Sequence, residues 1–321
     1  MTEPTLVVRE LVVRFAVHGS GRWLRAVDGV SFTLERGETL GVVGESGSGK
    51  STIARALVRL GPAATGAAWF RGANLLDLEG ARLRAMREHL QIVFQDPLGS
   101  LDPRMRVGAI LEEPLREFRP ELGRAARRDA ALAMLERVGL RAADLQRFPH
   151  EFSGGQAQRV GIARALMLKS ELLVCDEPIS ALDVSIKSQI ANLLKDLQQE
   201  LNLSVLFIAH DLAAVRFSCD RILVLYLGRV MEIGSRSALF EAPRHPYTRA
   251  LLQSVPIADP ALARARRLVP LSGEIPSPLS PPSGCVFRTR CPVAEPRCAD
   301  AAPPLRRVGA SDVACHRAEE L

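Results

Sequence analysis

The chain has 321 residues, enough for one large domain or two medium-sized ones with a well-buried core. Hydrophobic residues make up 47% of it and charged residues 24%, which excludes a disordered chain, a collagen-like repeat and a small disulfide scaffold. The net charge is +6, but the basic residues are spread evenly along the chain, whereas a nucleic-acid surface would gather them in one patch. Nearly all of them are Arg rather than Lys, which favours a GC-rich coding sequence as the cause of the positive charge.

No apolar run approaches the roughly 20 residues that span a bilayer, and the first residues lack the basic flank and apolar core of a signal peptide. We therefore expect a cytosolic protein, whose basic surface can lie against an anionic membrane. Cys175 and Cys219 stand among apolar residues, and we expect them to be small core residues.

Short β-branched runs alternate with helical stretches up to about residue 255, which is the pattern of an α/β domain. Strands are expected, in chain order, at Leu6–Phe15, Val27–Leu34, Thr39–Val43, Leu90–Phe94, Glu171–Cys175, Ser204–Ala209 and Arg221–Tyr226. Helices are expected at Gly49–Leu60 and Val184–Leu201. Residues 103–169 are rich in Arg, Ala, Leu and Glu without a strand candidate, so they are predicted to form a helical insertion.

The sequence Gly-Glu-Ser-Gly-Ser-Gly-Lys-Ser lies between the third of these strands and the first helix, which is the context that a P-loop requires. Its glycines let backbone N–H groups surround phosphate oxygens, and the helix N-terminus adds partial positive charge. Lys50 is expected to reach the β- and γ-phosphates, and Ser51 to bind Mg²⁺. The nucleotide-binding residues predicted here are Gly44, Glu45, Ser46, Gly47, Ser48, Gly49, Lys50, Ser51 and Thr52.

Two adjacent acidic residues, Asp176 and Glu177, end a run that has the pattern of a buried strand. Alternation along a strand places them on different sides of its tip, so they can have different roles. We expect Asp176 to hold Mg²⁺ through water and Glu177 to orient or deprotonate an attacking water. A strand end followed by a turn at Pro178 is the simpler interpretation of the pair taken alone.

A third motif consists of Ser153, Gly154, Gly155 and Gln156, which precede a helical run 23 residues before Asp176. Serine at a helix start is often only an N-cap. Following a P-loop in this order, however, the motif resembles the signature of the nucleotide-binding subunit of ABC transporters. That family more often has Leu where this chain has Phe152, a conservative difference because both residues are apolar.

The resemblance covers about residues 5–255 and implies a P-loop NTPase cassette: a RecA-like core sheet, an antiparallel β subdomain and a helical subdomain at about 103–169. It implies that Gln95 senses Mg²⁺ or the water and faces a membrane partner, that Asp183 contacts the nucleotide domain of a second chain, and that His210 touches the γ-phosphate. It also implies head-to-tail pairing, in which the Ser-Gly-Gly segment of one chain covers the ATP on the P-loop of the other. A single chain would then hydrolyse ATP only weakly.

The aromatic residue that stacks on adenine has two candidates. Phe15 ends the first predicted strand, where the family places this residue. An insertion from His18 to Arg25 brings Trp23 into contention. Phe15 is our choice, although either residue can simply belong to the core.

Residues 256–321 contain 11 of the 21 prolines, so this tail is expected to be loop and extended chain without a helical or sheet core of its own. The segments Gly228–Gly234 and Pro243–Thr248 and the cysteine-bearing tail resemble the oligopeptide/dipeptide branch of ABC importers. The tail cysteines are Cys285, Cys291, Cys298 and Cys315, spaced C-x5-C, C-x6-C and C-x16-C. In a cytosolic protein such a cluster suggests a metal centre before disulfides.

Zinc prefers close C-x2–4-C pairs, which the tail lacks, whereas wider spacing suits a four-iron cluster. The resemblance implies a [4Fe–4S] centre, which some members of the branch carry. Zinc, and free or disulfide-bonded cysteines, are the alternatives. A soft metal centre could fold the tail, either as a structural staple or as a redox sensor.

The implied function is that of an ATP-hydrolysing motor subunit of an ABC importer for di- or oligopeptides, with ATP and Mg²⁺ as cofactors. Nickel chelates, glutathione, sugars or another small solute are alternative cargoes. A soluble ABC ATPase acting on nucleic acid is the alternative from another class, and the compact single cassette argues against it. An exporter is disfavoured by the tail.

The implied partners are two permeases, a second ABC ATPase (more often a related chain than a second copy) and indirectly an extracytoplasmic binding protein, without nucleic acid. The implied location is peripheral, on the cytoplasmic face of the inner membrane.

Overall fold

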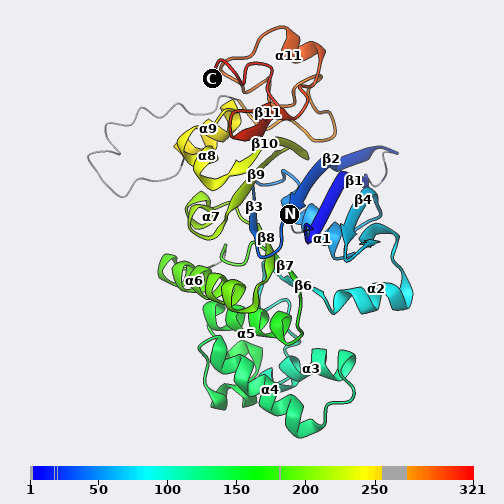
Figure 1. Cartoon of the computed structure of the whole chain (residues 1–321), viewed down its shortest axis with the longest axis vertical. Helices are drawn as coiled ribbons and strands as arrows, with labels where there is room; N and C mark the ends of the chain where they lie inside the picture. The colour runs from blue at the N-terminus through cyan, green and yellow to red at the C-terminus, as the bar shows by residue number, and fades with distance from the viewer. Residues whose placement is uncertain (1–2, 18, 20, 181, 255–272) are drawn as a thin grey trace, which may run out of the picture. The chain divides into compact units, whose positions relative to one another are not determined.

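The computed structural model describes residues 3–17, 19, 21–180, 182–254 and 273–321, and these form two compact units (Figure 1). Unit 1 consists of the described residues within the ranges 1–5, 34–38 and 77–209, and unit 2 of those within 6–33, 39–76 and 210–321. No helix within the described residues is long and apolar enough to cross a membrane.

Unit 2 contains a sheet with the strand order β2-β1-β4-β5. The strands are β1 (Leu6–Ala16), β2 (Trp23–Leu34), β4 (Ala64–Phe70) and β5 (Ala73–Asn74). Strand β1 forms because apolar residues such as Leu6 and Val8 alternate with exposed ones such as Arg9, so one face is buried. Strand β2 starts at Trp23, so the second half of the predicted insertion is partly strand; His18 lies outside the described residues.

Unit 2 also contains five strands in the order β11-β12-β10-β9-β3. They are β3 (Thr39–Val43), β9 (Arg221–Tyr226), β10 (Arg229–Ser235), β11 (Arg306–Val308) and β12 (Ser311–Val313). Strands β3 and β9 are parallel and nearly all their residues are buried, whereas the other neighbours pair antiparallel. The helices described in unit 2 are α1 (Lys50–Leu57), α7 (Leu212–Ser218), α8 (Arg236–Glu241), α9 (Pro246–Gln253) and α11 (Arg297–Asp300).

Unit 1 has three parallel strands in the order β8-β7-β6, namely β6 (Leu90–Val93), β7 (Leu172–Asp176) and β8 (Ser204–Ile208). Leu172 is the register partner of both Leu90 and Ser204, so the carboxyl ends of the three strands lie at the same edge. The helices of this unit are α2 (Gly80–Arg87), α3 (Val107–Phe118), α4 (Arg124–Arg137), α5 (Gly154–Leu166) and α6 (Val184–Leu201). Short 3-10 turns of this unit occupy Ala142–Gln146 and Pro149–Glu151, and a third, Leu75–Asp77, lies where the chain passes from unit 2 to unit 1.

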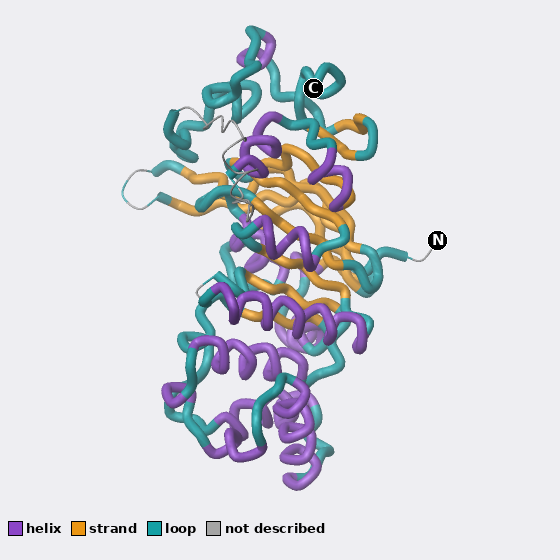
Figure 2. Tube along the Cα trace, turned by 90° about the vertical axis from the view of Figure 1, so that its left-hand side faces the viewer, coloured by secondary structure: helices purple, strands orange, loops and turns teal. Residues whose placement is uncertain are grey.

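Residues 103–169 contain α3, α4, α5 and two 3-10 turns and no strand, as Figure 2 shows in purple and teal. Helix α3 is amphipathic, with Ile110, Leu111 and Leu115 buried on one side. Cys175 and Cys219 are fully buried, which confirms their prediction as core residues.

The described part of the tail, residues 273–321, is mostly loop and turn as expected, but the expectation that it lacks a core of its own is wrong. Strands β11 and β12 form a hairpin, and β12 pairs with β10 so that Val313 stands opposite Glu232. Val308, Val313, Cys315 and Ala318 pack together as a small buried cluster. Strand β10 offers an edge to a neighbour, which is why two segments of three residues can become strands in a proline-rich tail.

Candidate nucleotide-binding site

The loop between β3 and α1 has the backbone shape that its glycines allow. Gly47 and Gly49 have φ of +76° and +105°, in the region that favours glycine. A Cβ atom on Gly49 would stand 2.2 Å from the Ala26 carbonyl oxygen, and one on Gly44 would stand 2.1 Å from that of Leu225. These two positions therefore admit no side chain, while Gly47 faces open space.

Lys50, the first residue of α1, folds back over this loop. Its Nζ donates hydrogen bonds to the carbonyl oxygens of Gly44 (2.9 Å) and Glu45 (3.0 Å), and only 5% of the residue is exposed. The Ser48 hydroxyl is buried and has no hydrogen-bond partner among the described residues. A lysine, a helix N-terminus and an unsatisfied hydroxyl thus belong to one loop, and together they can bind a phosphate chain.

Glu45 of the same loop contacts two residues whose positions the sequence did not predict. The Arg290 guanidinium donates to both carboxylate oxygens of Glu45, over 2.6 and 3.0 Å. The Glu45 N–H donates to the Tyr247 hydroxyl oxygen over 2.9 Å. Neither residue gave a local signal: Arg290 is one arginine of many, and Tyr247 counted only as part of a family pattern.

Phe15 and Trp23 line the same pocket, which has a volume of about 490 Å³. Val12, Arg14, Ala16, Pro62, Ala63 and Thr65 complete its lining. The Phe15 side chain is 38% exposed and that of Trp23 is 63% exposed, so both can offer a ring face to a ligand. The structure keeps both residues as candidates for stacking on a base.

The two acidic residues at the end of β7, in unit 1, differ in environment. Asp176 is 1% exposed, whereas Glu177 is half-buried and has φ of +49°, which is rare for a residue with a Cβ. The Glu177 N–H donates to the Ile208 carbonyl oxygen (3.0 Å), and Gln95 Nε2 donates to Glu177 Oε2 (3.1 Å). Two of the predicted catalytic residues, Gln95 and Glu177, are therefore in direct contact.

Ser153 begins α5 as its N-cap. Its hydroxyl accepts the Gln156 N–H (3.3 Å), and the Gln156 side chain accepts the Ser153 N–H (3.1 Å), a reciprocal capping box. Ser153 and Gly154 are exposed, while a Cβ on Gly155 would stand 2.5 Å from Ile186 Cγ2. The exposed start of α5 can accordingly contact another molecule.

Asp183 and His210 are both exposed. Asp183 lies at the N-cap position of α6 in unit 1. His210 belongs to unit 2 and directly precedes Asp211, whose carboxylate caps α7 by accepting the N–H groups of Ala213 and Ala214. Neither predicted residue is buried in the core, so each can contact a ligand or another chain.

The four tail cysteines are unpaired, and three of them are buried while Cys291 is half-buried. Burial raises the pKa of the Cys291 thiol to about 11, and the three other cysteines lie close enough to raise that pKa further. Hydrogen bonds from backbone N–H groups lower the pKa of three of the thiols and so partly offset the effect of burial. The donors are Phe287 and Arg288 for Cys285, Val293 for Cys291, and Arg317 for Cys315. In the described part of the chain, however, no three His, Cys, Asp or Glu side chains are arranged to hold a metal ion.

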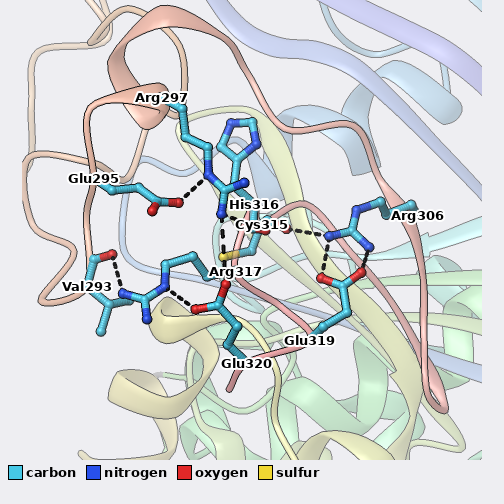
Figure 3. A network of polar contacts seen from close by, with 9 residues as sticks. All are labelled: Val293, Glu295, Arg297, Arg306, Cys315, His316, Arg317, Glu319 and Glu320. Carbon is cyan, nitrogen blue, oxygen red and sulfur yellow. Dashed lines mark hydrogen bonds and ion pairs between the residues drawn. The ribbon is translucent and has the colours of Figure 1, made fainter.

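Ion pairs surround the last cysteine (Figure 3). Arg306 pairs with Glu319 and also donates to the Cys315 carbonyl oxygen over 3.3 Å. Arg317 pairs with Glu320 over 2.8 Å. Of these contacts, only the hydrogen bond from Arg306 reaches the backbone of Cys315 itself.

His245 is a fully buried residue at the start of α9. Its Nδ1 accepts the Tyr247 N–H (3.0 Å), and its own N–H donates to the buried carboxylate of Glu232 (2.9 Å). Burial lowers the pKa of His245 to about 3, although a hydrogen bond with the Ala314 backbone opposes this. His245 is therefore a neutral N-cap of α9. Its contact with the Tyr247 N–H holds Tyr247 in this helix, and the Tyr247 hydroxyl reaches Glu45.

Comparison with known proteins agrees with this geometry. The ABC transporter family matches residues 27–180, and the oligopeptide/dipeptide transporter C-terminal region matches residues 231–298. The oligopeptide transport ATP-binding protein OppF of Salmonella typhimurium is 50% identical over 98% of this chain and 97% of its own. A putative peptide import ATP-binding protein of Brucella ovis is 52% identical over 96% of each chain.

Solved structures with a similar fold are also ATP-binding cassettes or parts of ABC transporters. A dimeric ATP-binding cassette, MJ0796, bound to ADP and Pi, has a TM-score of 0.66 and 29% identity, covering 72% of this chain and 98% of its own. The cbiO1 protein from Clostridium perfringens, part of an ABC transporter complex, has a TM-score of 0.66 and 28% identity over 75% of this chain and 92% of its own.

Proposed function

The chain belongs to the ATP-binding subunits of the oligopeptide/dipeptide branch of ABC transporters, and we propose that the cargo of its transporter is a di- or oligopeptide. It is an ATP-hydrolysing motor subunit of an importer. The observation that carries the peptide assignment is that the likeness to oligopeptide transport proteins extends over 98% of the chain, tail included.

Residues Gly44 to Thr52 are proposed to bind the phosphates of ATP. The glycine-dependent path of the loop, the buried Ser48 hydroxyl and the position of Lys50 support this. The Ser51 hydroxyl, the Asp176 carboxylate and the Gln95 amide are the proposed Mg²⁺ site, because magnesium prefers such hard oxygen ligands. Mg²⁺ bound with ATP supplies positive charge that offsets the charge of the phosphates. Phe15 is proposed to stack on adenine, with Trp23 of the same pocket as the alternative.

Glu177 is the proposed general base. Its backbone is held in a rare conformation by the Ile208 carbonyl, and its carboxylate accepts a hydrogen bond from Gln95, so its side chain has a defined direction. A carboxylate in this position can orient a water molecule and accept its proton. Gln95 then positions that carboxylate, and His210 is proposed to contact the γ-phosphate.

A second cassette is proposed to complete the nucleotide site. The exposed Ser153 and Gly154 at the start of α5, with Gly155 and Gln156 behind them, would cover the ATP on the partner's P-loop, and the exposed Asp183 would contact the partner. A helix N-terminus favours an anionic ligand, which fits a phosphate from the opposite chain. The proposed partner is a related ATPase chain rather than a second copy of this one.

We assign residues 5–255 to the ATPase domain, about 103–169 of them to its helical subdomain, and 256–321 to the C-terminal region. The family matches at 27–180 and 231–298 support a division of this kind, although the second begins before residue 256. The proposed assembly contains two membrane permeases and works with an extracytoplasmic binding protein. The chain is then peripheral, on the cytoplasmic face of the inner membrane.

The four tail cysteines are proposed to hold a soft metal centre, [4Fe–4S] rather than zinc. The burial of three of the four thiols and the closeness of the other three cysteines to Cys291 support this, although the side chains of the described residues are not arranged as metal ligands. Iron and acid-labile sulfide, measured on full-length protein purified without oxygen, test it. About four of each per chain are expected; zinc, or no metal, would contradict it.

ATP hydrolysis by the transporter, reconstituted from this chain with its permeases, second ATPase and binding protein, tests the function. A di- and oligopeptide pool should raise the rate, and the Glu177→Gln variant should abolish the rise. Stimulation only by glutathione, a nickel chelate or a sugar would replace the peptide assignment. A complex without ATP hydrolysis would refute the motor role.

A further inference from the structure

The C-terminal tail contacts the P-loop through the loop that Cys285 and Cys291 enclose. Arg290 lies in this loop and is bonded through both terminal nitrogens to both carboxylate oxygens of Glu45, although 245 residues separate the two in sequence. The Arg290 side chain is 7% exposed and that of Glu45 is 23% exposed. A two-pronged pair of this kind fixes direction as well as distance, and an almost buried guanidinium is strongly disfavoured without its carboxylate.

Aromatic rings hold Arg290 in place. Its guanidinium carbon lies 5.9 Å from the centre of the Tyr226 ring, and Nη1 lies 3.4 Å from the Tyr226 hydroxyl. The Phe287 ring, three residues before Arg290, packs edge-on against Tyr226, with ring centres 5.3 Å apart. The arginine therefore reaches Glu45 from a rigid base rather than from a free loop.

Glu45 is held at its main chain as well. Its N–H donates to the hydroxyl of Tyr247, a residue with 0% exposure whose ring packs against both Tyr226 (4.7 Å) and Phe287 (5.2 Å). On the other side, the Glu45 carbonyl oxygen accepts a hydrogen bond from Lys50 Nζ. A continuous set of contacts thus leads from Arg290 through Glu45 to the lysine of the P-loop.

We propose that Arg290 is a positioning residue of the nucleotide site, which acts through Glu45 to hold the P-loop in its ATP-binding conformation. The cysteine-bearing tail is then part of the nucleotide site rather than an appendage. This inference rests on the proposed function, because it requires that the P-loop bind ATP.

Equilibrium binding of a fluorescent N-methylanthraniloyl ATP analogue with Mg²⁺ to the full-length chain tests the proposal. Arg290→Gln and Glu45→Gln should each weaken binding about tenfold, within the usual range of coupling between sites. The double variant should bind no more weakly than either single variant, because both remove the same interaction. Arg290→Lys should recover part of the affinity, since it keeps the charge without the fork.

Arg288→Gln is the matched control. Arg288 lies in the same loop and bonds only within the tail, to the backbone and hydroxyl oxygens of Ser283 among the described contacts. Its loss should leave nucleotide binding within twofold of wild type. In the assembled transporter, Arg290→Gln should raise the KM for ATP and change kcat by less than twofold, a split that general loss of folded protein does not produce.

Binding by Arg290→Gln and Glu45→Gln within twofold of wild type would overturn the proposal, as would losses that add in the double variant. Should Arg290→Gln fail to fold, Glu45→Gln and Arg290→Lys still decide, because a wild-type affinity in both contradicts the proposal. A wild-type chain that does not bind the analogue would instead refute the proposed function.

Discussion

At the residue scale, Glu177 combines an unusual backbone with a directed side chain. Its φ of +49° costs about 1–3 kcal/mol, and hydrogen bonds to Ile208 and from Gln95 hold it there. Because Glu177 is the proposed base, Glu177→Gln should lower kcat of the assembled transporter by about 10²–10⁴-fold and leave ATP binding nearly unchanged. Steady-state phosphate release and equilibrium nucleotide binding measure the two quantities.

The control for this change is Glu171→Gln, an exposed carboxylate that directly precedes the other end of β7. Its activity should equal that of wild type. A Glu177→Gln transporter with more than a tenth of the wild-type kcat would show that another group accepts the proton.

His245 makes the stability of the protein depend on pH. Its pKa is about 3 in the folded protein because it is buried, and about 6.5 in an unfolded chain. Between these values the unfolded chain binds more protons than the folded one. The contribution of His245 to stability is therefore complete above about pH 6.5, and it decreases by about 1.4 kcal/mol for each unit by which the pH falls below that value. His245→Asn keeps a capping oxygen but cannot titrate, so its unfolding free energy should decline less steeply in this range.

Urea unfolding from pH 7 to pH 4.5 measures these slopes. His150→Gln is the control, because His150 is exposed, and its slope should follow wild type. Parallel curves for His245→Asn and wild type would mean that His245 is not a buried neutral cap.

At the element scale, the glycines of the turn from β3 into α1 differ in how closely other atoms pack against them, so replacing them should cost different amounts of stability. Gly49→Ala would place a Cβ 2.2 Å from the Ala26 carbonyl oxygen at a φ of +105°, so we expect a loss of about 2–5 kcal/mol of unfolding free energy. Gly47→Ala meets open space, so only its backbone strain of about 1–2 kcal/mol counts. Equal losses in urea unfolding of the two variants would contradict the close packing of this turn.

The elements also show what could be predicted from the sequence. Strands β3 and β9 and helix α6 have the predicted bounds, because each is a continuous apolar or amphipathic run. Strand β4, with the sequence ATGAAWF, was missed, because Ala and Gly carry no strand pattern and its pairing with β1 forms the strand. Strands β11 and β12 were missed for a similar reason: they are short and depend on the edge of β10.

The candidate site divides in the same way. The P-loop, the acidic pair and the start of α5 could be predicted, because phosphate chemistry demands fixed residues at fixed local spacing. Contacts of Glu45 with Arg290 and Tyr247 could not, since they join segments more than 200 residues apart. The positive φ of Glu177 had no sequence signal either, because glutamate rarely adopts it.

At the scale of the whole molecule, the loop between β3 and α1 is bonded within unit 2 to residues far along the chain, both in α9 and in the tail. Strand β12 extends β10, Tyr247 bonds the backbone of Glu45, and Arg290 bonds its side chain. The likeness to an oligopeptide transport ATP-binding protein extends over both the cassette and this tail.

The most direct test of the central claim is uptake of a labelled oligopeptide into vesicles that contain the complete transporter, with ATP supplied to the face that carries this chain. We expect ATP-dependent uptake with the wild-type chain and almost none with Glu177→Gln. Uptake that is equal in both, or a wild-type transporter that hydrolyses ATP but moves no peptide, would contradict the assignment of this chain as the motor of peptide import.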